Sequence, residues 1–298
     1  MDNRMKTTLF ILLGLIVTSY FVSFFFSGND TLGTENVAVI KIDKPILSGQ
    51  VGLFGDEFIT SDEIISFIDD ANKKENIKAI IFEINSPGGS AVASAEVSSA
   101  VQKINKTKIA WVREVGASGA YWIASSTDSI VTHPLSLVGS MGVISSYVDV
   151  SGLFTHYNVT YNRLVAGKYK DMGTPLKSLT DEERNLFQTK LDKIHTVFIK
   201  NVAANRQLSE EYVRNLSTGE VYLGMEAKEL GLVDVLGGKD ETITLVKQRA
   251  NLTEVFLVEY HKEKSFLETV MGLFSQQSFH VGEGMASFFM KSELSVKT

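Results

Sequence analysis

Short runs of β-branched and other apolar residues alternate along the chain with stretches in which apolar residues recur every three or four positions. The first pattern is typical of buried strands, and the second of helices that pack on a sheet. Strands are expected at residues 37–42, 78–84, 109–112, 129–132, 143–148, 160–166, 233–236 and 255–260. Helices are expected at residues 91–104, 116–125, 151–157, 210–216, 226–230 and 240–251, and after two capping boxes at residues 60–63 and 180–183. Residues 44–58 are expected to form a loop and residues 137–142 a turn. Strands that alternate with helices predict an α/β domain with a mostly parallel sheet and right-handed crossovers.

The front of the chain has a different pattern. Thr7 to Phe26 is a run of twenty residues without a charge, which is long enough as a helix to cross a bilayer. Arg4 and Lys6 precede it, and cations at this end favour a cytoplasmic N-terminus, with the rest of the chain on the other side. A cleavable signal peptide is the alternative, but the run is longer than the usual apolar core of such peptides. We therefore predict a single uncleaved anchor.

The chain divides by composition into five parts. Residues 1–6 are the expected cytoplasmic end and 7–26 the anchor, and the polar residues 27–36 suit a linker. Residues 37–262 carry the alternating elements and are expected to form the main domain. Residues 263–298 hold clusters of apolar side chains, and we expect a helical tail that packs on the domain or on a neighbouring subunit.

Composition limits the chemistry of the domain. The 298 residues carry a net charge of -6 and include no cysteine, so thiolate nucleophiles, disulfides and thiolate metal sites are excluded. Basic residues do not cluster beyond the first few positions, which argues against nucleic acid as a substrate. The sequence indicates neither a metal site nor a cofactor.

Ser118 is the candidate nucleophile. It lies among small residues, between the expected strand 109–112 and a helical segment, in the sequence Gly-Ala-Ser-Gly-Ala that begins at Gly116. Small neighbours leave a serine hydroxyl uncovered and allow a sharp strand-to-helix turn. Close packing of a helix on a sheet selects the same residue types, so this stretch alone leaves both readings open.

A serine nucleophile also needs N–H donors for the oxyanion and a base. Asn85 to Gly89 follows another expected strand, and Gly88 or Gly89, with the amide of Ser118 or Gly119, is the implied oxyanion hole. An ordinary Pro-Gly turn is the plainer alternative.

Histidine and lysine are the candidate bases. His133 and His156 are the histidines nearest to this region in sequence, and each is more easily explained as structural. A lysine base must lose its proton near neutral pH, which burial favours. Lys170 lies in the sequence Gly-Lys-Tyr-Lys-Asp that starts at Gly167, although a lysine in a polar loop is commonly just solvated.

Four motifs together resemble the signal peptide peptidase A family of bacteria and archaea. In chain order they are Asn85-Ser-Pro-Gly-Gly89, Gly116-Ala-Ser-Gly-Ala-Tyr121, Gly139-Ser-Met-Gly-Val143 and Gly167-Lys-Tyr-Lys-Asp171. The likeness covers roughly residues 37–252, behind one anchor. Four ordered motifs are a specific signal where any one is weak. The methionine of the third motif stands where isoleucine is common, a change that keeps the volume.

The resemblance implies a fold and the roles of several residues. The fold is the Clp-protease/crotonase-like α/β fold with repeated ββα units, and the activity is that of a serine endopeptidase of family S49 with a Ser/Lys dyad. By motif position Ser118 is the nucleophile, Lys170 the base and Ser140 the serine that orients the lysine. Gly88 and Gly89 match the oxyanion-hole turn.

The resemblance also implies partners and a location. Substrates are cleaved signal peptides and other unfolded apolar peptides, and the domain lies outside the cytoplasmic face of the membrane. The chain has room for one catalytic unit, as in the short form of the family, in which a ring of identical subunits shares each site between neighbours. Two alternatives stay open: a crotonase-like acyl-CoA enzyme and a non-catalytic membrane scaffold of the same fold.

Overall fold

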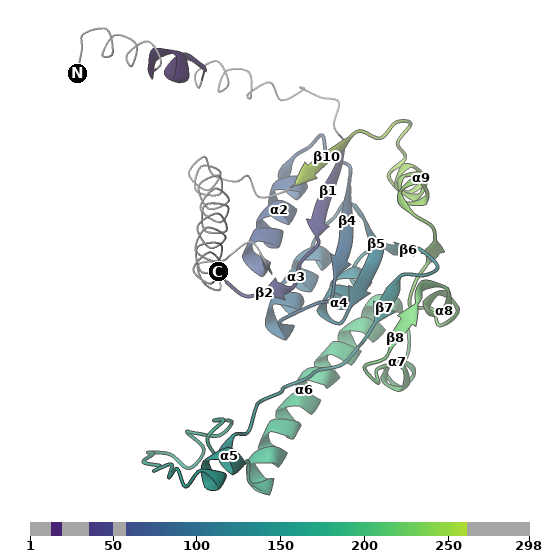
Figure 1. The fold of residues 1–298 in the computed structure, drawn as a ribbon. Coiled ribbons are helices and arrows are strands. Elements are labelled where there is room, and N and C mark those ends of the chain that lie inside the picture. Colours follow the sequence, from purple (N-terminus) through teal and green to yellow (C-terminus); the bar gives the residue numbers. More distant parts are fainter. Residues whose placement is uncertain (1–12, 20–35, 50–57, 261–298) are drawn as a thin grey trace, which may run out of the picture. The chain divides into compact units, whose positions relative to one another are not determined.

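The computed structural model describes residues 13–19, 36–49 and 58–260 (Figure 1). The chain divides into two compact units, Met1–Tyr260 and His261–Thr298. The expected tail, residues 263–298, therefore lies outside the described residues, as do linker residues 27–35 and residues 50–57 of the expected loop.

The expected membrane anchor is described only in its middle. Residues 13–19 are helical, and the rest of Thr7 to Phe26 lies outside the described residues. Within the described part of the chain, no helix combines the length and the apolar character needed to cross a bilayer.

A parallel-rich sheet forms the centre of the first unit. Its strands are β1 (Val37–Ile42), β4 (Ala79–Ser86), β5 (Thr107–Ala117), β6 (Ser129–Thr132), β7 (Leu137–Gly139), β8 (Val221–Leu223), β9 (Val235–Leu236) and β10 (Leu257–Tyr260). The order is β10-β1-β4-β5-β6-β9, with every neighbouring pair parallel. β7 continues beside the end of β5 in parallel and pairs with β8 in the antiparallel sense. A separate parallel pair joins β2 (Ile46–Leu47) to β3 (Ile59–Thr60).

Both faces of the sheet are buried. Successive residues of its strands point to opposite sides, so each strand supplies apolar side chains to both faces. On β4, Ile80 and Phe82 pack toward the larger of the two cores, whereas Ala79 and Ile81 pack toward the smaller. The helices α2 (Ser61–Lys73) and α6 (Asp181–Arg206) contribute Ile64 and Ile199 to the larger core. This double burial explains why the strands read as continuous apolar runs.

Within residues 36–49 and 58–260, eight helices accompany these strands. They are α2 (Ser61–Lys73), α3 (Ala91–Gln102), α4 (Gly119–Ser125), α5 (Ser151–His156), α6 (Asp181–Arg206), α7 (Glu210–Leu216), α8 (Gly224–Glu229) and α9 (Lys239–Ala250). At the first expected capping box the Thr60 hydroxyl accepts from the Glu63 amide, which is one half of the box. At the second, Thr180 and Glu183 cap each other reciprocally, so that box is complete. The predicted α/β architecture with a mostly parallel sheet is confirmed.

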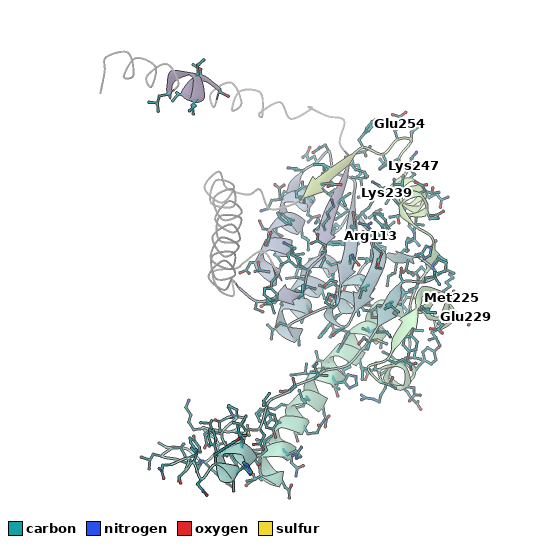
Figure 2. All side chains as sticks on the ribbon, viewed as in Figure 1. Arg113, Met225, Glu229, Lys239, Lys247 and Glu254 are labelled. Carbon is teal, nitrogen blue, oxygen red and sulfur yellow. The ribbon has the colours of Figure 1, made fainter. Side chains whose placement is uncertain are left out.

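Residues 143–180, which form most of the segment between β7 and α6, differ most from the sequence prediction; we call them the arm. Strands were expected at 143–148 and 160–166, yet neither forms, and α5 is the arm's regular element (Figure 1). A β-branched run forms a strand only where a neighbouring strand pairs with it. Here the side chains are open to solvent: Ile144 is 92% exposed and Leu164 96%. Figure 2 shows the side chains around α5 projecting outward from the ribbon. The turn expected at 137–142 is also partly wrong, because its first three residues form β7.

Candidate active site

Ser118 is the single residue between the end of β5 and the start of α4. Its backbone has φ 53° and ψ -123°, a conformation that is rare outside glycine and marks a sharp bend. The bend is fixed on both sides: the Ser118 amide donates to the Gly139 carbonyl at 2.7 Å, and its carbonyl accepts from the Trp122 amide at 3.0 Å. The side chain is half-buried. A strained strand-to-helix bend with a serine at its apex is the geometry that presents a nucleophile.

Ser140 lies beside Ser118. Ala117 and Gly139 are paired in the β5–β7 register, so each serine is the next residue beyond the carboxyl end of adjacent parallel strands. Ser140 also has a positive φ, 49°. Its amide donates to the Glu220 carbonyl at 2.8 Å, and its hydroxyl donates to the Gly219 carbonyl at 3.1 Å. The hydroxyl oxygen keeps its lone pairs, with which it can accept a hydrogen bond from an amine.

Gly88 packs directly against this bend. A β-carbon at Gly88 would lie 2.6 Å from the Gly119 nitrogen, 2.7 Å from the Ala117 oxygen and 3.0 Å from the Ser118 β-carbon. The φ of Gly88 is +95°, which also requires glycine. Its own amide donates to the Ser86 hydroxyl at 3.2 Å. Gly88 thus allows the close approach of the two turns, while its N–H is used within its own turn.

The backbone amides of Gly89 and Gly119 lie close together where these turns meet. The bridge between Ile46 and Gly89 uses the Gly88 carbonyl and the Ser90 amide, so the N–H of Gly89 points away from Ile46. Its nitrogen lies 3.4 Å from the position of a β-carbon on Gly119. The Gly119 amide belongs to the first turn of α4, where N–H groups lack an intrahelical acceptor. The amides of Gly89 and Gly119 are therefore suited to bind an oxyanion; those of Gly88 and Ser118 are engaged elsewhere.

Lys170 is not brought to Ser118 within the chain. Lys168 and Tyr169, its neighbours, both bond the Glu182 carboxylate at the start of α6. Trp122, one turn along α4 from Ser118, stacks on Phe198 with ring centroids 4.6 Å apart. Glu182 and Phe198 are sixteen residues apart on one helix, or about 24 Å at ~1.5 Å per residue. The structure thus joins Ser118, Ser140, Gly88, Gly89 and Gly119, and leaves Lys170 at the other end of α6.

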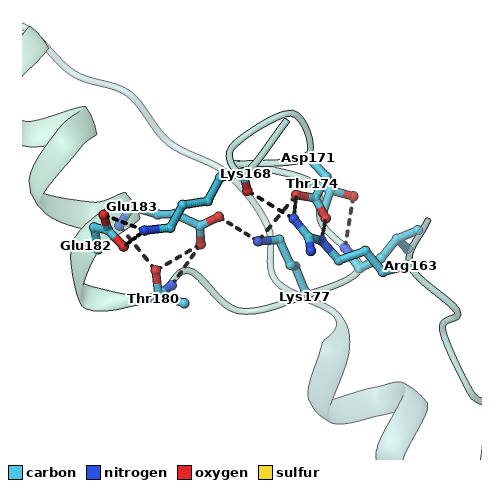
Figure 3. A network of polar contacts seen from close by, with 9 residues as sticks. Arg163, Lys168, Asp171, Thr174, Lys177, Thr180, Glu182 and Glu183 are labelled. Carbon is cyan, nitrogen blue, oxygen red and sulfur yellow. Dashed lines mark hydrogen bonds and ion pairs between the residues drawn. The ribbon is translucent and has the colours of Figure 1, made fainter. Parts of the chain in front are cut away.

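A network of charged side chains fixes the loop that carries Lys170 (Figure 3). Arg163 forms a two-pronged bond to the Asp171 carboxylate, with one prong at 2.8 Å, and also donates to the Lys168 carbonyl at 3.0 Å. Lys177 contacts Asp171 at 3.6 Å and Glu183 at 2.6 Å. The hydrogen bonds from Arg163 lower the pKa of Asp171 to about 2. The loop is thereby tied to the capped start of α6.

The two histidines considered as bases make other contacts. His133 is exposed and its Nδ1 accepts from the Leu135 amide at 3.2 Å, while His156 lies in the arm and packs edge-on against Tyr157. A third histidine was missed by sequence reasoning: His195 of α6 is hydrogen-bonded through Nε2 to the Met141 carbonyl at 3.1 Å, one residue beyond Ser140. No local motif signals this contact, because the partners are 54 residues apart. Among residues 13–19, 36–49 and 58–260, no cluster of three acidic, histidine or cysteine side chains is arranged to hold a metal.

Comparison with known proteins agrees with this geometry. Residues 100–253 match the profile of Peptidase family S49. The chain is 31% identical over 282 residues to a putative protease of Methanocaldococcus jannaschii, covering 92% of this chain and 90% of the relative. It is 29% identical to a putative signal peptide peptidase SppA of Enterococcus faecium, covering 78% and 69%. A solved structure of a membrane-bound stomatin-specific protease, a lysine-to-alanine variant in complex with a substrate peptide, has a similar fold: TM-score 0.50, 19% identity, 82% of this chain and 100% of that chain. This chain therefore belongs to peptidase family S49, and it is a serine endopeptidase.

Proposed function

We propose that this endopeptidase works with a Ser118/Lys170 dyad shared between subunits, the serine from one chain and the lysine from the next. The observation that carries the proposal is the division of the site. Ser118, Ser140 and the amides of Gly89 and Gly119 lie together near the Phe198 part of α6. The loop that carries Lys170 is instead bonded to Glu182, about 24 Å from Phe198 along the same helix. A neighbouring subunit can supply the lysine. The head-to-tail contact that this requires, repeated from subunit to subunit, gives a ring when the rotation between neighbours closes.

The proposed reaction follows from the position of each group. The neutral Lys170 amine, held by a hydrogen bond to the Ser140 oxygen, takes the proton from Ser118 as its Oγ attacks the substrate carbonyl. The oxyanion is bound by the Gly89 and Gly119 amides. The lysine ammonium then gives its proton to the departing amine, leaving an acyl ester on Ser118. Water, deprotonated by the same amine, attacks the ester and releases the second product and the serine.

The proposed substrates are cleaved signal peptides and other unfolded apolar segments. The name of the Enterococcus relative supports this class. The apolar run Thr7 to Phe26 and the cations before it support an anchored enzyme whose domain lies on the extracytoplasmic side. A ring of Clp-protease/crotonase-like subunits held close to the bilayer would meet released signal peptides there, and a narrow entrance would exclude folded proteins.

Active-site labelling tests this proposal. A fluorophosphonate probe is expected to modify Ser118 and to leave the Ser118→Ala variant unlabelled. The labelling rate should rise with pH, because only the neutral amine of Lys170 accepts the serine proton. An acyl-CoA enzyme or a scaffold would not be labelled. Labelling of another serine, or a pH dependence that disappears in His133→Ala or His156→Ala, would replace the proposed dyad with a different one.

A further inference from the structure

The environment of Lys170 differs from that of every other cation around it. Three carboxylates lie around the loop that carries Lys170, and each has a cationic partner. Asp171 pairs with Arg163 and Lys177, Glu182 with Lys168, and Glu183 with Lys177. Figure 3 shows these pairs. Lys170 is exposed, and within the described residues it takes part in no ion pair.

This distribution of charge bears on the use of Lys170 as a base. A carboxylate within about 4–6 Å of a lysine favours the ammonium form, which cannot accept a proton. Asp171 follows Lys170 directly in the chain, so it is the carboxylate best placed to pair with it. Arg163 prevents this pairing, because its guanidinium binds both oxygens of Asp171, whose side chain is only 9% exposed.

We propose that Arg163 is a positioning residue for the dyad: by holding the Asp171 carboxylate it keeps this charge from pairing with Lys170 and so leaves the amine free to deprotonate. The proposal rests on the proposed role of Lys170 as base. The other groups facing the loop are Lys168 and Tyr169 from the loop itself, Lys177 before α6, and Glu182 and Glu183 on α6, all engaged with one another. Arg163 also bonds the Lys168 carbonyl and so fixes the backbone two residues before Lys170.

The pair stays charged throughout the pH range in which the enzyme would be assayed. The pKa of Asp171 is lowered from its usual 3.8 to about 2, chiefly by the hydrogen bonds from Arg163. Because the pKa of Asp171 is lowered in the folded chain, the pair contributes fully to the stability of the fold at any pH above the pKa that Asp171 has in the unfolded chain. This contribution is lost only as the pH falls through about 2. A change in the activity profile at neutral or alkaline pH therefore cannot come from the titration of Asp171.

The pH profile of kcat in Arg163→Gln tests the proposal. Without Arg163, Asp171 keeps only its longer 3.6 Å contact with Lys177 and can also pair with Lys170. The rising part of the profile should then move to higher pH by about half a unit to one unit, and activity at a pH below it should fall roughly three- to tenfold. The high-pH plateau should remain within about twofold of wild type, because there the amine is neutral in both enzymes. The double variant Arg163→Gln/Asp171→Asn removes both charges, so the pH at which its kcat rises should return to the wild-type value. Arg113→Gln, which breaks a comparable surface pair with Glu83 on β4, is the matched control and should not move the rising part of the profile.

Two outcomes separate this inference from the proposed function. The inference is overturned if Lys170→Ala is inactive but the rising part of the pH profile of Arg163→Gln stays at the wild-type pH. It is also overturned if Arg163→Gln lowers only the high-pH plateau and the double variant does not restore that plateau. In either case Arg163 has no electrostatic role. If Lys170→Ala itself remains fully active, the lysine base is wrong. The ring assembly of each variant is measured by size-exclusion chromatography with light scattering. A variant that fails to assemble would show that its lower high-pH kcat comes from a displaced arm.

Discussion

Ser118→Ala and Lys170→Ala are each expected to lower kcat for peptide hydrolysis by about 10⁴-fold or more, because residues of one catalytic unit fail together when either is removed. The expected cause is chemical: one variant lacks the attacking oxygen and the other lacks the group that accepts its proton. Both are compared with wild type in a fluorogenic peptide assay at equal concentrations of assembled protein.

Neither change should unfold the domain. Ser118 is half-buried in a turn and Lys170 is exposed, so the free energy of unfolding should change far less than the 2–5 kcal/mol typical of a buried Leu→Ala change. Lys193→Ala removes another exposed lysine, on α6, and is the control that should keep full activity. Substantial turnover by a purified Ser118→Ala or Lys170→Ala enzyme would remove that residue from the dyad.

Gly88→Ala is expected to have the next largest effect, a loss of at least about 10²- to 10³-fold in kcat, which is the cost of one misplaced oxyanion donor. The added β-carbon would lie 2.6 Å from the Gly119 nitrogen and 2.7 Å from the Ala117 oxygen. Both contacts are with backbone atoms, so the Gly119 amide must move. The split between kcat and KM, measured with the same peptide, should show the loss mainly in kcat.

Gly231→Ala provides the matched control for Gly88→Ala. Gly231 also has a positive φ, +73°, but its added β-carbon would meet only the Leu208 side chain at an ordinary 3.8 Å. The Gly231→Ala variant therefore has an alanine at a positive φ, like Gly88→Ala, but does not crowd the site, so it should stay active. If Gly88→Ala and Gly231→Ala lose activity equally, strain alone explains the loss, and Gly88 does not protect the oxyanion site.

Most of the fold could be predicted because its elements carry local signals. The boundaries of α7 were expected where they are found, and Thr60 and Thr180 marked two helix starts through hydrogen bonds that lie within four residues. The arm had equally β-branched sequence but no strand formed, because strand formation depends on a partner that the sequence of one segment does not specify. The error at 143–148 and 160–166 is therefore one of tertiary context.

The site was predictable only in part, for a similar reason. Ser118, Ser140 and the glycines follow strand ends, and the carboxyl ends of adjacent parallel strands must meet at one edge. Sequence reasoning left open whether Gly88 or Gly89 donates; the hydrogen bond from the Gly88 amide to Ser86 favours Gly89. The place of Lys170 depends on the length of α6, and the contact of His195 with Met141 depends on how that helix packs, neither of which a motif encodes.

Mixing the two inactive variants tests the shared site most directly. Ser118→Ala and Lys170→Ala chains, unfolded together or co-expressed in equal amounts and reassembled, should form rings in which some serines meet a lysine from the next subunit. With random assembly about one quarter of the sites, one half times one half, regain both residues, so about one quarter of wild-type activity is expected. Each variant reassembled alone should stay inactive. Mixed rings that contain both chains, verified by mass spectrometry, and yet hydrolyse no peptide would contradict the shared site and require Ser118 and Lys170 of the same chain to meet.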